Sequence, residues 1–473
     1  MEFLVRFSQA HESFRLPELQ ALADLEGIDM KVVEYSLDSP FCIIALPSID
    51  LAPRLVARSL LTQSIHLLLA SAPTHDAIHP ILKSQLASPS PTTFDWSAVS
   101  SSTFKFSLDT YQSSRPHASF VSLINGYKYL PLHGAIDLKT PELHLTIFED
   151  WDLRGTEGPK RVHLARFLAT GARSLSLKYD LKKRGYISTT SMDSELALVT
   201  ANLAHAAPGK LFYDPFVGTG SFPVACAHFG ALGFGSDIDG RAIRGSGGEK
   251  SVKGNFAQYG LSERIGEFWT ADLTNSPVRR VRWLDGIVCD PPYGVREGLR
   301  VLGCRDPEKT PWVVEAGKQR YKLVTPFPQS ALFHPLPSYH DGRGINNADN
   351  TRSGDFIAPK KPYSFLAMLD DILEFASETL VDGGRLSFWM PTANDEDQEI
   401  PTPQHPRLDI VVTCVQPFNK WSRRLITYRR IPDNQVDPER LAAYKRTFVA
   451  GTTADELNPF RRGYFTKFEK EEA

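Results

Sequence analysis

The sequence predicts an α/β protein in which a Rossmann-like, mostly parallel seven-stranded sheet is preceded by a smaller α+β domain. The main observation is a regular alternation of strand-like and helix-like segments after residue 190, which is typical of a parallel sheet with helices on both faces. Before residue 160, strands and helices follow one another at the spacing of small ferredoxin-like units. The length of 473 residues also favours two or three domains over one.

The first 160 residues alternate between period-two and helical patterns of apolar residues. We expect helices near residues 16–25, 54–61 and 119–129, and strands near 2–8, 32–35, 41–46, 65–70, 103–109 and 143–148. No group of side chains in these segments suggests catalytic geometry. We therefore interpret this part of the chain as a binding module.

The second half contains seven candidate strands. They are expected at residues 210–214, 233–237, 267–272, 285–290, 385–390, 409–414 and 425–429. The last two follow each other without a helix, so we expect them to pair antiparallel at one edge of the sheet. About seventy residues (294–363) separate the fourth strand from the next helix, far beyond the usual loop length. This insert is either a lid or a disordered segment.

Composition and charge limit the possible partners and compartments. The formal net charge is −2, so any nucleic-acid surface must be a local patch. Residues 178–184, 278–282 and 420–430 are candidates, although each is equally well explained as a solvated face. The five cysteines form no C-x-x-C pair, which argues against a metal knuckle or a disulfide framework. With no apolar stretch approaching 18 residues and no leader-like N-terminus, we expect no membrane span and a cytoplasmic protein.

The first chemical motif is a glycine-rich turn, D-P-F-V-G-T-G, after an apolar strand and before a helix. Glycine lets a ligand approach the backbone, and the amide groups at the helix start favour an anionic group. The carboxylate of the methionine part of S-adenosylmethionine fits this role. A dinucleotide is the alternative, but G-x-G-x-x-G is absent because Pro223 occupies the third glycine position. The residues expected to bind the cofactor here are Asp214, Phe216, Gly218, Thr219 and Gly220.

Acidic residues also follow the second and third strands. Asp237 ends the second strand, where a carboxylate can accept hydrogen bonds from ribose hydroxyls. Asp239 could replace it, but Asp239 is better placed as the N-cap of the helix that starts near Arg241. Asp272 ends the third strand and is expected to accept a hydrogen bond from the adenine amino group.

The fourth motif is Asp290-Pro291-Pro292-Tyr293, directly after the fourth strand. An exocyclic amine of a base is a poor nucleophile because its lone pair is delocalised into the ring. The Asp290 carboxylate and the Pro291 carbonyl could hold both amine hydrogens and turn the lone pair toward a methyl donor. The prolines stiffen the turn, and Tyr293 offers an aromatic face to an extruded base. The sequence thus predicts methyl transfer to an amine, with these four residues as the catalytic set.

These motifs resemble those of the catalytic subunits of eukaryotic tRNA guanosine-10 N2-methyltransferases. The resemblance is carried by SLKYDLKKRGYISTTSMDSELALVTANLAHAAPGKLFYDPFVGTGSF, GSDIDGR, CDPPYGVREG and NKWSRRLITYRR, and by LVRFSQAHESFRLPEL and GAIDLKTPELHLTIFED near the N-terminus. The last of these is typical of a THUMP domain, which binds the acceptor end of tRNA. The resemblance spans nearly the whole chain, but within residues 298–361 only scattered positions match.

The resemblance implies an activity, a domain order and a partner. The chain would transfer a methyl group from S-adenosylmethionine to N2 of guanosine 10 in tRNA, and would work with a small zinc-binding activator protein. Residues 1–160 would form the THUMP-containing domain, 161–190 a basic linker, 191–440 the class I methyltransferase domain and 441–473 a C-terminal extension. No metal site is expected in the chain itself.

Two alternatives remain open at this point. The amine acceptor could instead be cytosine N4, adenine N6 or a protein glutamine amide, although glutamine enzymes usually carry Asn-Pro-Pro-Tyr. The chain could also be a non-catalytic RNA-binding scaffold, which fits poorly with an intact glycine turn beside an intact D-P-P-Y motif.

Overall fold

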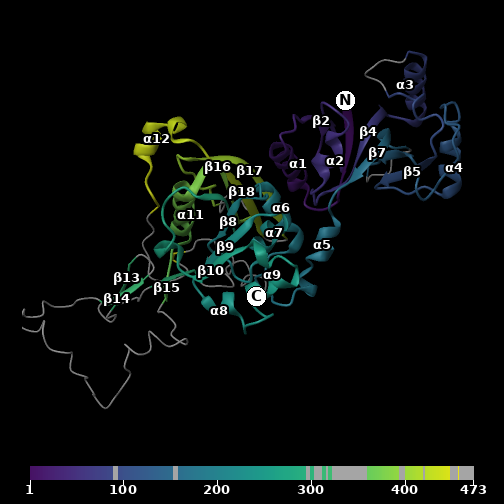
Figure 1. The fold of residues 1–473 in the computed structure, drawn as a ribbon. Helices are drawn as coiled ribbons and strands as arrows, with labels where there is room; N and C mark the ends of the chain where they lie inside the picture. The colour runs from purple at the N-terminus through teal and green to yellow at the C-terminus, as the bar shows by residue number, and fades with distance from the viewer. Residues whose placement is uncertain are drawn as a thin grey trace, which may run out of the picture. The chain divides into compact units, whose positions relative to one another are not determined.

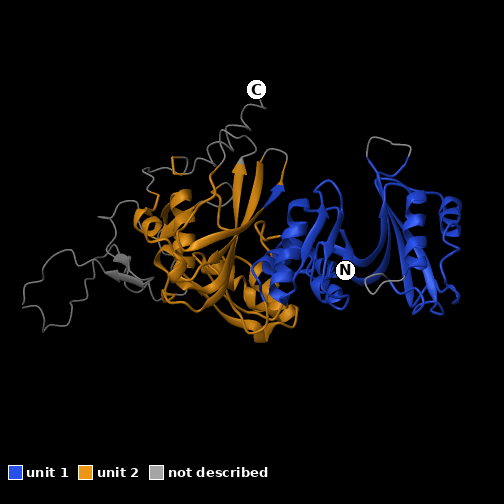
Figure 2. Cartoon of the chain, turned by 90° about the horizontal axis from the view of Figure 1, so that it is seen from above, with its two compact units in different colours: residues 1–184, 193–206, 414–416 blue, residues 185–192, 207–413, 417–473 orange. Residues whose placement is uncertain are grey.

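The computed structural model describes residues 1–88, 94–152, 158–294, 299–302, 312–315, 318–321, 360–393, 400–418, 421–447 and 456–457. The chain forms two compact units (Figure 2). Unit 1 contains residues 1–184, 193–206 and 414–416, and unit 2 contains residues 185–192, 207–413 and 417–473. No helix in the described ranges is both long and apolar enough to cross a membrane.

Unit 1 is built on one continuous sheet of seven strands, in the order β2-β3-β1-β4-β7-β6-β5 (Figure 1). Strands β5 and β6 are parallel, and the other neighbouring pairs are antiparallel. The strands are β1 (Glu2–Phe7), β2 (Lys31–Tyr35), β3 (Phe41–Ala45), β4 (Thr62–Ala72), β5 (Phe104–Tyr111), β6 (Leu143–Asp150) and β7 (Arg161–Thr170). The helices are α1 (Glu12–Glu26), α2 (Leu51–Val56), α3 (His75–Ala87), α4 (His117–Asn125), α5 (Ser174–Lys178) and α6 (Ser194–Leu203), with a 3-10 turn, η1 (Leu181–Lys183).

Two elements of unit 1 differ from the sequence-based boundaries. Strand β7 falls within the predicted linker, because Val162 and Leu164 are fully buried and the strand pairs with both β4 and β6. Helix α6 falls within the predicted methyltransferase domain but groups with unit 1. There Asn202 donates to the buried Glu18 carboxylate (Nδ2–Oε1 2.7 Å) and accepts from Arg58 (Nε–Oδ1 2.9 Å). Asp193 caps this helix, accepting from the backbone N–H groups of Glu195 and Leu196.

Unit 2 confirms the mostly parallel seven-stranded sheet, with the order β10-β9-β8-β11-β16-β18-β17. Its strands, β8 (Leu211–Asp214), β9 (Leu232–Asp237), β10 (Ile265–Thr270), β11 (Leu284–Cys289), β16 (Leu380–Ala393), β17 (Leu408–Pro417) and β18 (Trp421–Arg430), overlap the seven predicted ones. Strand β18 runs antiparallel to β16. The outermost strands of the order are β10 and β17, and they form the two edges of the sheet.

Helices cover the two faces of this sheet unevenly. Helices α7 (Ser221–His228) and α9 (Val252–Gln258) lie on one face, since Pro223 and Phe256 both approach Gly233 of β9. Helix α11 (Phe365–Thr379) packs on the other face against Tyr213 of β8. The connection from β10 to β11 contains a 3-10 turn, η3 (Leu273–Asn275), in place of a helix. The remaining helical elements of unit 2 are α8 (Gly240–Arg244), η2 (Ser262–Arg264), η7 (Asp433–Gln435) and α12 (Pro438–Ala443).

The predicted insert contains two short antiparallel pairs. One joins β12 (Arg300–Leu302) to β15 (Lys360–Pro362), and the other joins β13 (Trp312–Glu315) to β14 (Lys318–Tyr321). Most of the insert lies outside the described residues, as do residues 458–473.

Candidate active site

The predicted site residues gather at the carboxyl ends of four neighbouring parallel strands. Asp214 ends β8 and Asp237 ends β9, while Asp272 follows β10 and Asp290 follows β11. Parallel strands bring these ends to one edge of the sheet, which is where open α/β sheets bind ligands. The structure therefore brings the four acidic positions together as the sequence suggested.

The glycine turn after β8 is held in a conformation that only glycine adopts easily. Gly218 and Gly220 have φ values of 49° and 84°, in the left-handed region where a Cβ is strained. A Cβ on Gly220 would lie 2.9 Å from Cγ1 of Val252, whereas a Cβ on Gly218 would meet nothing nearer than the Phe216 carbonyl, at 3.9 Å. The space in front of Gly218 is thus open to a ligand.

Asn255 is a supporting residue that sequence reasoning missed. It is fully buried on α9, and its Nδ2 donates to the carbonyls of Thr219 (2.9 Å) and Tyr186 (2.8 Å). The Thr219 hydroxyl is also 2.7 Å from the Ser191 hydroxyl. These contacts hold the backbone and the Thr219 side chain of the glycine turn in place. A single asparagine within a helix gives no periodic signal, so only the fold shows its role.

The Asp237 carboxylate accepts backbone N–H groups from both sides of the site. Its Oδ2 lies 3.0 Å from the Gly218 nitrogen and its Oδ1 lies 2.8 Å from the Asp239 nitrogen. These two bonds fix the orientation of the carboxylate at the end of β9. Asp239 instead caps α8 and pairs with Arg241 (Oδ2–Nη2 2.6 Å), which lowers the pKa of Asp239 to about 2. The predicted capping role of Asp239 is confirmed.

Asp214 and Asp272 are buried and engaged with their own chain. Oδ1 of Asp214 accepts from the Phe216 nitrogen at 2.9 Å, which closes the turn. Burial raises the pKa of Asp214 well above its usual value, and the nearby Asp237 and Asp290 add to the shift. Asp272 caps η3 through Thr274 and accepts from the Leu302 nitrogen at 2.9 Å. Direct contacts of Asp214 and Asp272 with a cofactor remain predictions.

The D-P-P-Y turn is closed by its own side chains. The Tyr293 hydroxyl donates to Oδ1 of Asp290, and Nη1 of Arg423 lies 3.6 Å from Oδ2. Burial, followed by the Asp290 charge, raises the pKa of Tyr293 well above its usual range, so this side chain is a neutral donor. Pro291 and Pro292 leave the turn without backbone N–H groups there, which leaves the Pro291 carbonyl as an acceptor beside Asp290.

Three arginines of the basic stretch 420–430 do not belong to a solvated patch, whereas Arg429, with a side chain 56% exposed, is solvated. Arg430 is 1% exposed and pairs with Asp382 and Asp433, while Arg424 is 7% exposed and donates to the Ile400 carbonyl. Arg423, whose side chain is 16% exposed, points to Asp290. These arginines are therefore structural or part of the site.

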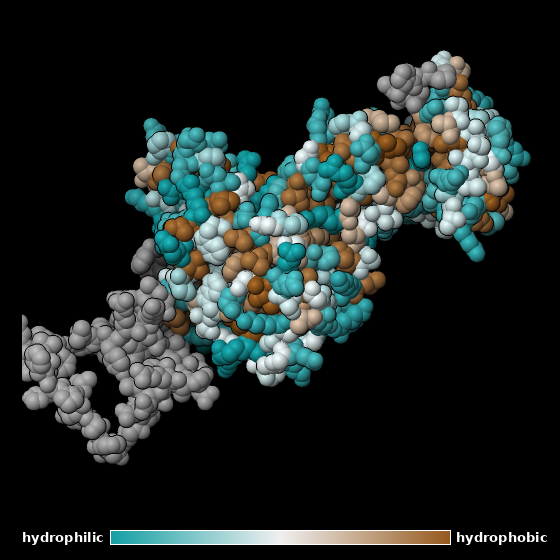
Figure 3. Space-filling model, viewed as in Figure 1, coloured by the Kyte–Doolittle hydropathy of each residue, from teal (hydrophilic) through white to brown (hydrophobic). Residues whose placement is uncertain are grey.

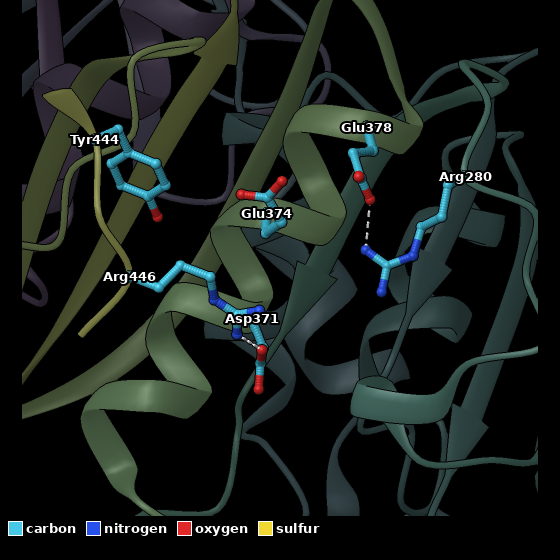
Figure 4. Close-up of a pocket in the computed structure, with 6 residues that line it drawn as sticks. All are labelled: Arg280, Asp371, Glu374, Glu378, Tyr444 and Arg446. Carbon is cyan, nitrogen blue, oxygen red and sulfur yellow. Dashed lines mark hydrogen bonds and ion pairs between the residues drawn. The ribbon is translucent and has the colours of Figure 1, made fainter. Parts of the chain in front are cut away.

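Unit 2 also contains a hollow of about 430 Å³ that none of the four strand-end acids lines (Figure 4). Its lining residues are Arg280, Asp371, Glu374, Glu378, Tyr444 and Arg446. The three acids on α11 are already neutralised, because Asp371 pairs with Arg446, Glu378 with Arg280 and Glu374 with His405. This hollow contains none of the predicted site residues.

The site has the features that S-adenosylmethionine needs. The open space before Gly218 would receive its methionine end, and the oriented Asp237 carboxylate would receive its ribose hydroxyls. Next to them, the Asp290 carboxylate and the Pro291 carbonyl form a pair of acceptors. Together with the strand order, this arrangement defines an S-adenosylmethionine-dependent methyltransferase.

Comparison with known proteins identifies the family. Residues 1–173 match the model of the Tmrp11 THUMP N-terminal domain, and residues 182–300 match the model of the RMKL-like methyltransferase domain. The chain is 39% identical to the tRNA (guanine(10)-N(2))-methyltransferase of Saccharomyces cerevisiae, over 90% of this chain and 92% of the yeast protein. Its identity to the enzymes of that name is 33% in Schizosaccharomyces pombe, over 91% and 90% of the two chains, and 30% in Homo sapiens, over 91% and 88%. The chain belongs to the tRNA (guanine(10)-N(2))-methyltransferase family.

Proposed function

We propose that this enzyme transfers the methyl group of S-adenosylmethionine to N2 of guanosine 10 in tRNA, giving N2-methylguanosine. The observation that carries the proposal is the Asp290-Pro291-Pro292-Tyr293 turn beside the glycine turn, in a chain whose relatives are named for this reaction. The alternatives of a different base amine or of a non-catalytic scaffold have no observation in their favour.

The proposed mechanism uses two acceptors to orient the amine. Asp290 and the Pro291 carbonyl would each accept one N2 hydrogen, with the amine taking the place of the Tyr293 hydroxyl at Asp290. The nitrogen lone pair is then withdrawn from conjugation with the ring and faces the sulfonium methyl for in-line attack. The new N–C bond forms as the S–C bond breaks, the sulfur keeps the electron pair, and the nitrogen releases one proton toward Asp290 or water. The Tyr293 ring, freed from its hydrogen bond, would lie against the guanine face.

The test is methylation of matched tRNAs that differ only at position 10. Guanosine 10 should be converted to N2-methylguanosine, whereas inosine 10, which lacks the exocyclic amine, and adenosine 10 should not react. Mass spectrometry of the nucleosides gives the product. Methylation of the inosine substrate, or of another base in all three tRNAs, would refute the proposal.

We propose that unit 1 grips the tRNA and that the enzyme works in the cytoplasm. The THUMP match over residues 1–173 supports the first point. The cysteines within the described ranges, Cys42, Cys226, Cys289 and Cys414, are buried and form no disulfide, which supports a reducing compartment.

We further propose that a small zinc-binding activator protein docks beside β10. This strand is an edge of the sheet, so its outer side pairs with no other strand among the described residues and could accept an added strand. The Phe268 N–H already donates to the Glu267 carboxylate at 2.8 Å, so an added strand would have to displace that contact. Because no helix follows β10, the neighbouring face is lined by Trp269 and by the segment from Pro277 to Trp283, around a hollow of about 390 Å³. Apolar residues interrupt the hydrophilic surface in this part of unit 2 (Figure 3). The alternative is that a helix or the C-terminal tail, residues 458–470, covers this edge, and those tail residues lie outside the described ranges.

The activator proposal is tested by co-expression and by a pair of matched variants. Co-expression should raise the soluble yield and the cofactor affinity of the chain. Val281→Asp, at a site 43% exposed beside β10, should weaken the complex, whereas Val411→Asp, 42% exposed on the opposite edge strand β17, should not. Equal losses in the two variants, or none in either, would place the partner elsewhere.

A further inference from the structure

We propose that Arg423 is the positioning residue of the methyl-transfer site, holding the Asp290 carboxylate in the orientation that accepts the guanine amine. The inference rests on the proposed function, since it assigns a role in that same reaction. Arg423 lies on β18, opposite Pro391 of β16 in the strand register. It comes from a strand far along the chain from the D-P-P-Y motif, so only the fold brings it to Asp290.

The guanidinium group is fixed by aromatic rings. Its Cζ lies 4.7 Å from the ring centre of Trp389, which is fully buried, and 5.7 Å from that of Phe418. Phe418 in turn stacks on Trp421, with ring centres 4.7 Å apart. A cation over an indole face is held by the ring quadrupole as well as by packing. Arg423 is thus a rigid charge, unlike a long side chain in solvent.

The distance to Asp290 suits a group that orients a carboxylate by its charge. At 3.6 Å, Nη1 of Arg423 and Oδ2 of Asp290 form an ion pair that is longer than a hydrogen bond. The charge therefore attracts the carboxylate oxygens without a direct hydrogen bond from Nη1 to Oδ2. A shorter, bidentate pair would compete with the substrate for these oxygens.

The other groups that face Asp290 make a cation useful. Tyr293 is a neutral phenol on Oδ1, Cys289 is a buried thiol, and Asp214 is a second acid close enough to interact. A second acid close by repels the negative charge of Asp290, and an opposite charge within about 4–6 Å offsets this repulsion. Arg423 supplies this charge at Oδ2 of Asp290, and it interacts with the Tyr293 phenol as well.

The test compares R423M, R423K and the control R429M in the full chain, on tRNA carrying guanosine 10. Methionine keeps much of the stem over Trp389 and removes the charge. Arg429 is on the same strand but its side chain is 56% exposed, at 3.9 Å from Asp409. We expect R423M to lose kcat by about a hundredfold, as for a misoriented reacting pair, with the same affinity for S-adenosylmethionine. The acidic limb of its pH–rate profile should move to higher pH.

The lysine variant separates charge from packing. R423K should recover at least tenfold over R423M and keep the wild-type acidic limb, whereas R429M should match the wild type throughout. The inference would be overturned if R423M kept the wild-type rate and the wild-type acidic limb of the pH–rate profile. It would also be overturned if R423M lost affinity for S-adenosylmethionine in proportion to activity, because that result indicates a structural role. If R423M does not fold, R423K decides alone, and a shifted limb there overturns the charge role. Absence of methylation by the wild type on guanosine 10 refutes the proposed function instead.

Discussion

Two seven-stranded sheets in one chain differ in how they surround their acidic side chains. In unit 1, Glu18 is fully buried and accepts from the Ser59 hydroxyl, from the nitrogens of Leu60 and Leu61, and from Asn202. Glu149, also fully buried, accepts from Arg115, Trp151 and His75. Both acids are enclosed by donors of their own unit, because side chains and loops from several elements close over them.

In unit 2, the corresponding acids lie where parallel strands end. Asp237 and Asp290 are oriented by neighbours, but they remain on the side of the sheet where a ligand can reach them. The difference follows from topology, since parallel strands collect their carboxyl ends at one edge and antiparallel strands do not. Asp214 and Asp272 also lie at strand ends, but they are buried and bonded to their own chain, so it is Asp237 and Asp290 that we expect to act in chemistry.

Among the substitutions that test this comparison, the one at Asp290 should have the largest effect on activity. Asp290→Ala should reduce methyl transfer by about a hundredfold or more, because the reacting amine loses an orienting acceptor. Affinity for S-adenosylmethionine should stay near wild type, because Asp290 faces the amine. Single-turnover kinetics and calorimetric titration measure the two quantities. Turnover within a few fold of wild type would remove Asp290 from the catalytic set.

Asp237 should show the converse pattern, with loss of cofactor binding. Asp237→Ala should weaken binding by about 2–3 kcal/mol, since charge-assisted hydrogen bonds to the ribose hydroxyls are lost. Asp239→Ala is the matched control, and should cost only the cap of α8, about 0.5–2 kcal/mol of stability. Calorimetry that found the loss in Asp239→Ala rather than Asp237→Ala would reverse the two roles.

The smallest predicted effect is that of Glu149→Gln, which should change the free energy of unfolding and leave the methylation rate unchanged. Burial acts to raise its pKa, but hydrogen bonds from His75, Arg115 and Trp151 outweigh burial and lower the pKa to about 2, from the ordinary glutamate value of 4.5. The folded pKa is depressed, so the carboxylate stabilises unit 1 above about pH 4.5, and this contribution is lost as the pH falls toward 2. Glu149→Gln should cost about 2 kcal/mol at neutral pH, after allowance for the partly exposed partners.

Denaturant titrations at pH 7 and pH 3.5 test this sign. The gap between wild type and Glu149→Gln should narrow at the lower pH, and methylation per folded molecule should be unchanged. A gap that widened on acidification would mean that the carboxylate is not stabilised by these contacts.

The sequence predicted unit 2 well because its signals are local. Alternating apolar segments and acidic strand ends predicted all seven strands and the positions of Asp214, Asp237, Asp272 and Asp290 at or after the ends of four of them. Each of these depends on residues close together in the chain or on the fixed rules of βαβ connection.

What the sequence could not predict depends on long-range contacts. Strand β7 was taken for a linker because its place between β4 and β6 is set by partners about 100 and 20 residues earlier. Arg423 was grouped with a possible basic surface, since its approach to Asp290 depends on the pairing of β18 with β16. Asn255 carried no pattern at all. In each case the decisive partner is far away in sequence.

The interleaved division of the chain has a consequence for synthesis on the ribosome. Unit 1 is not continuous in sequence, because residues 193–206 complete it after the chain has entered unit 2. The Glu18 carboxylate therefore lacks its Asn202 donor until about two hundred residues have emerged, and Ser13 meets the Val415 backbone only when the last strands have been made. The N-terminal unit, although translated first, cannot be finished first, and a nascent chain stalled before residue 200 would expose an incomplete core to chaperones and proteases.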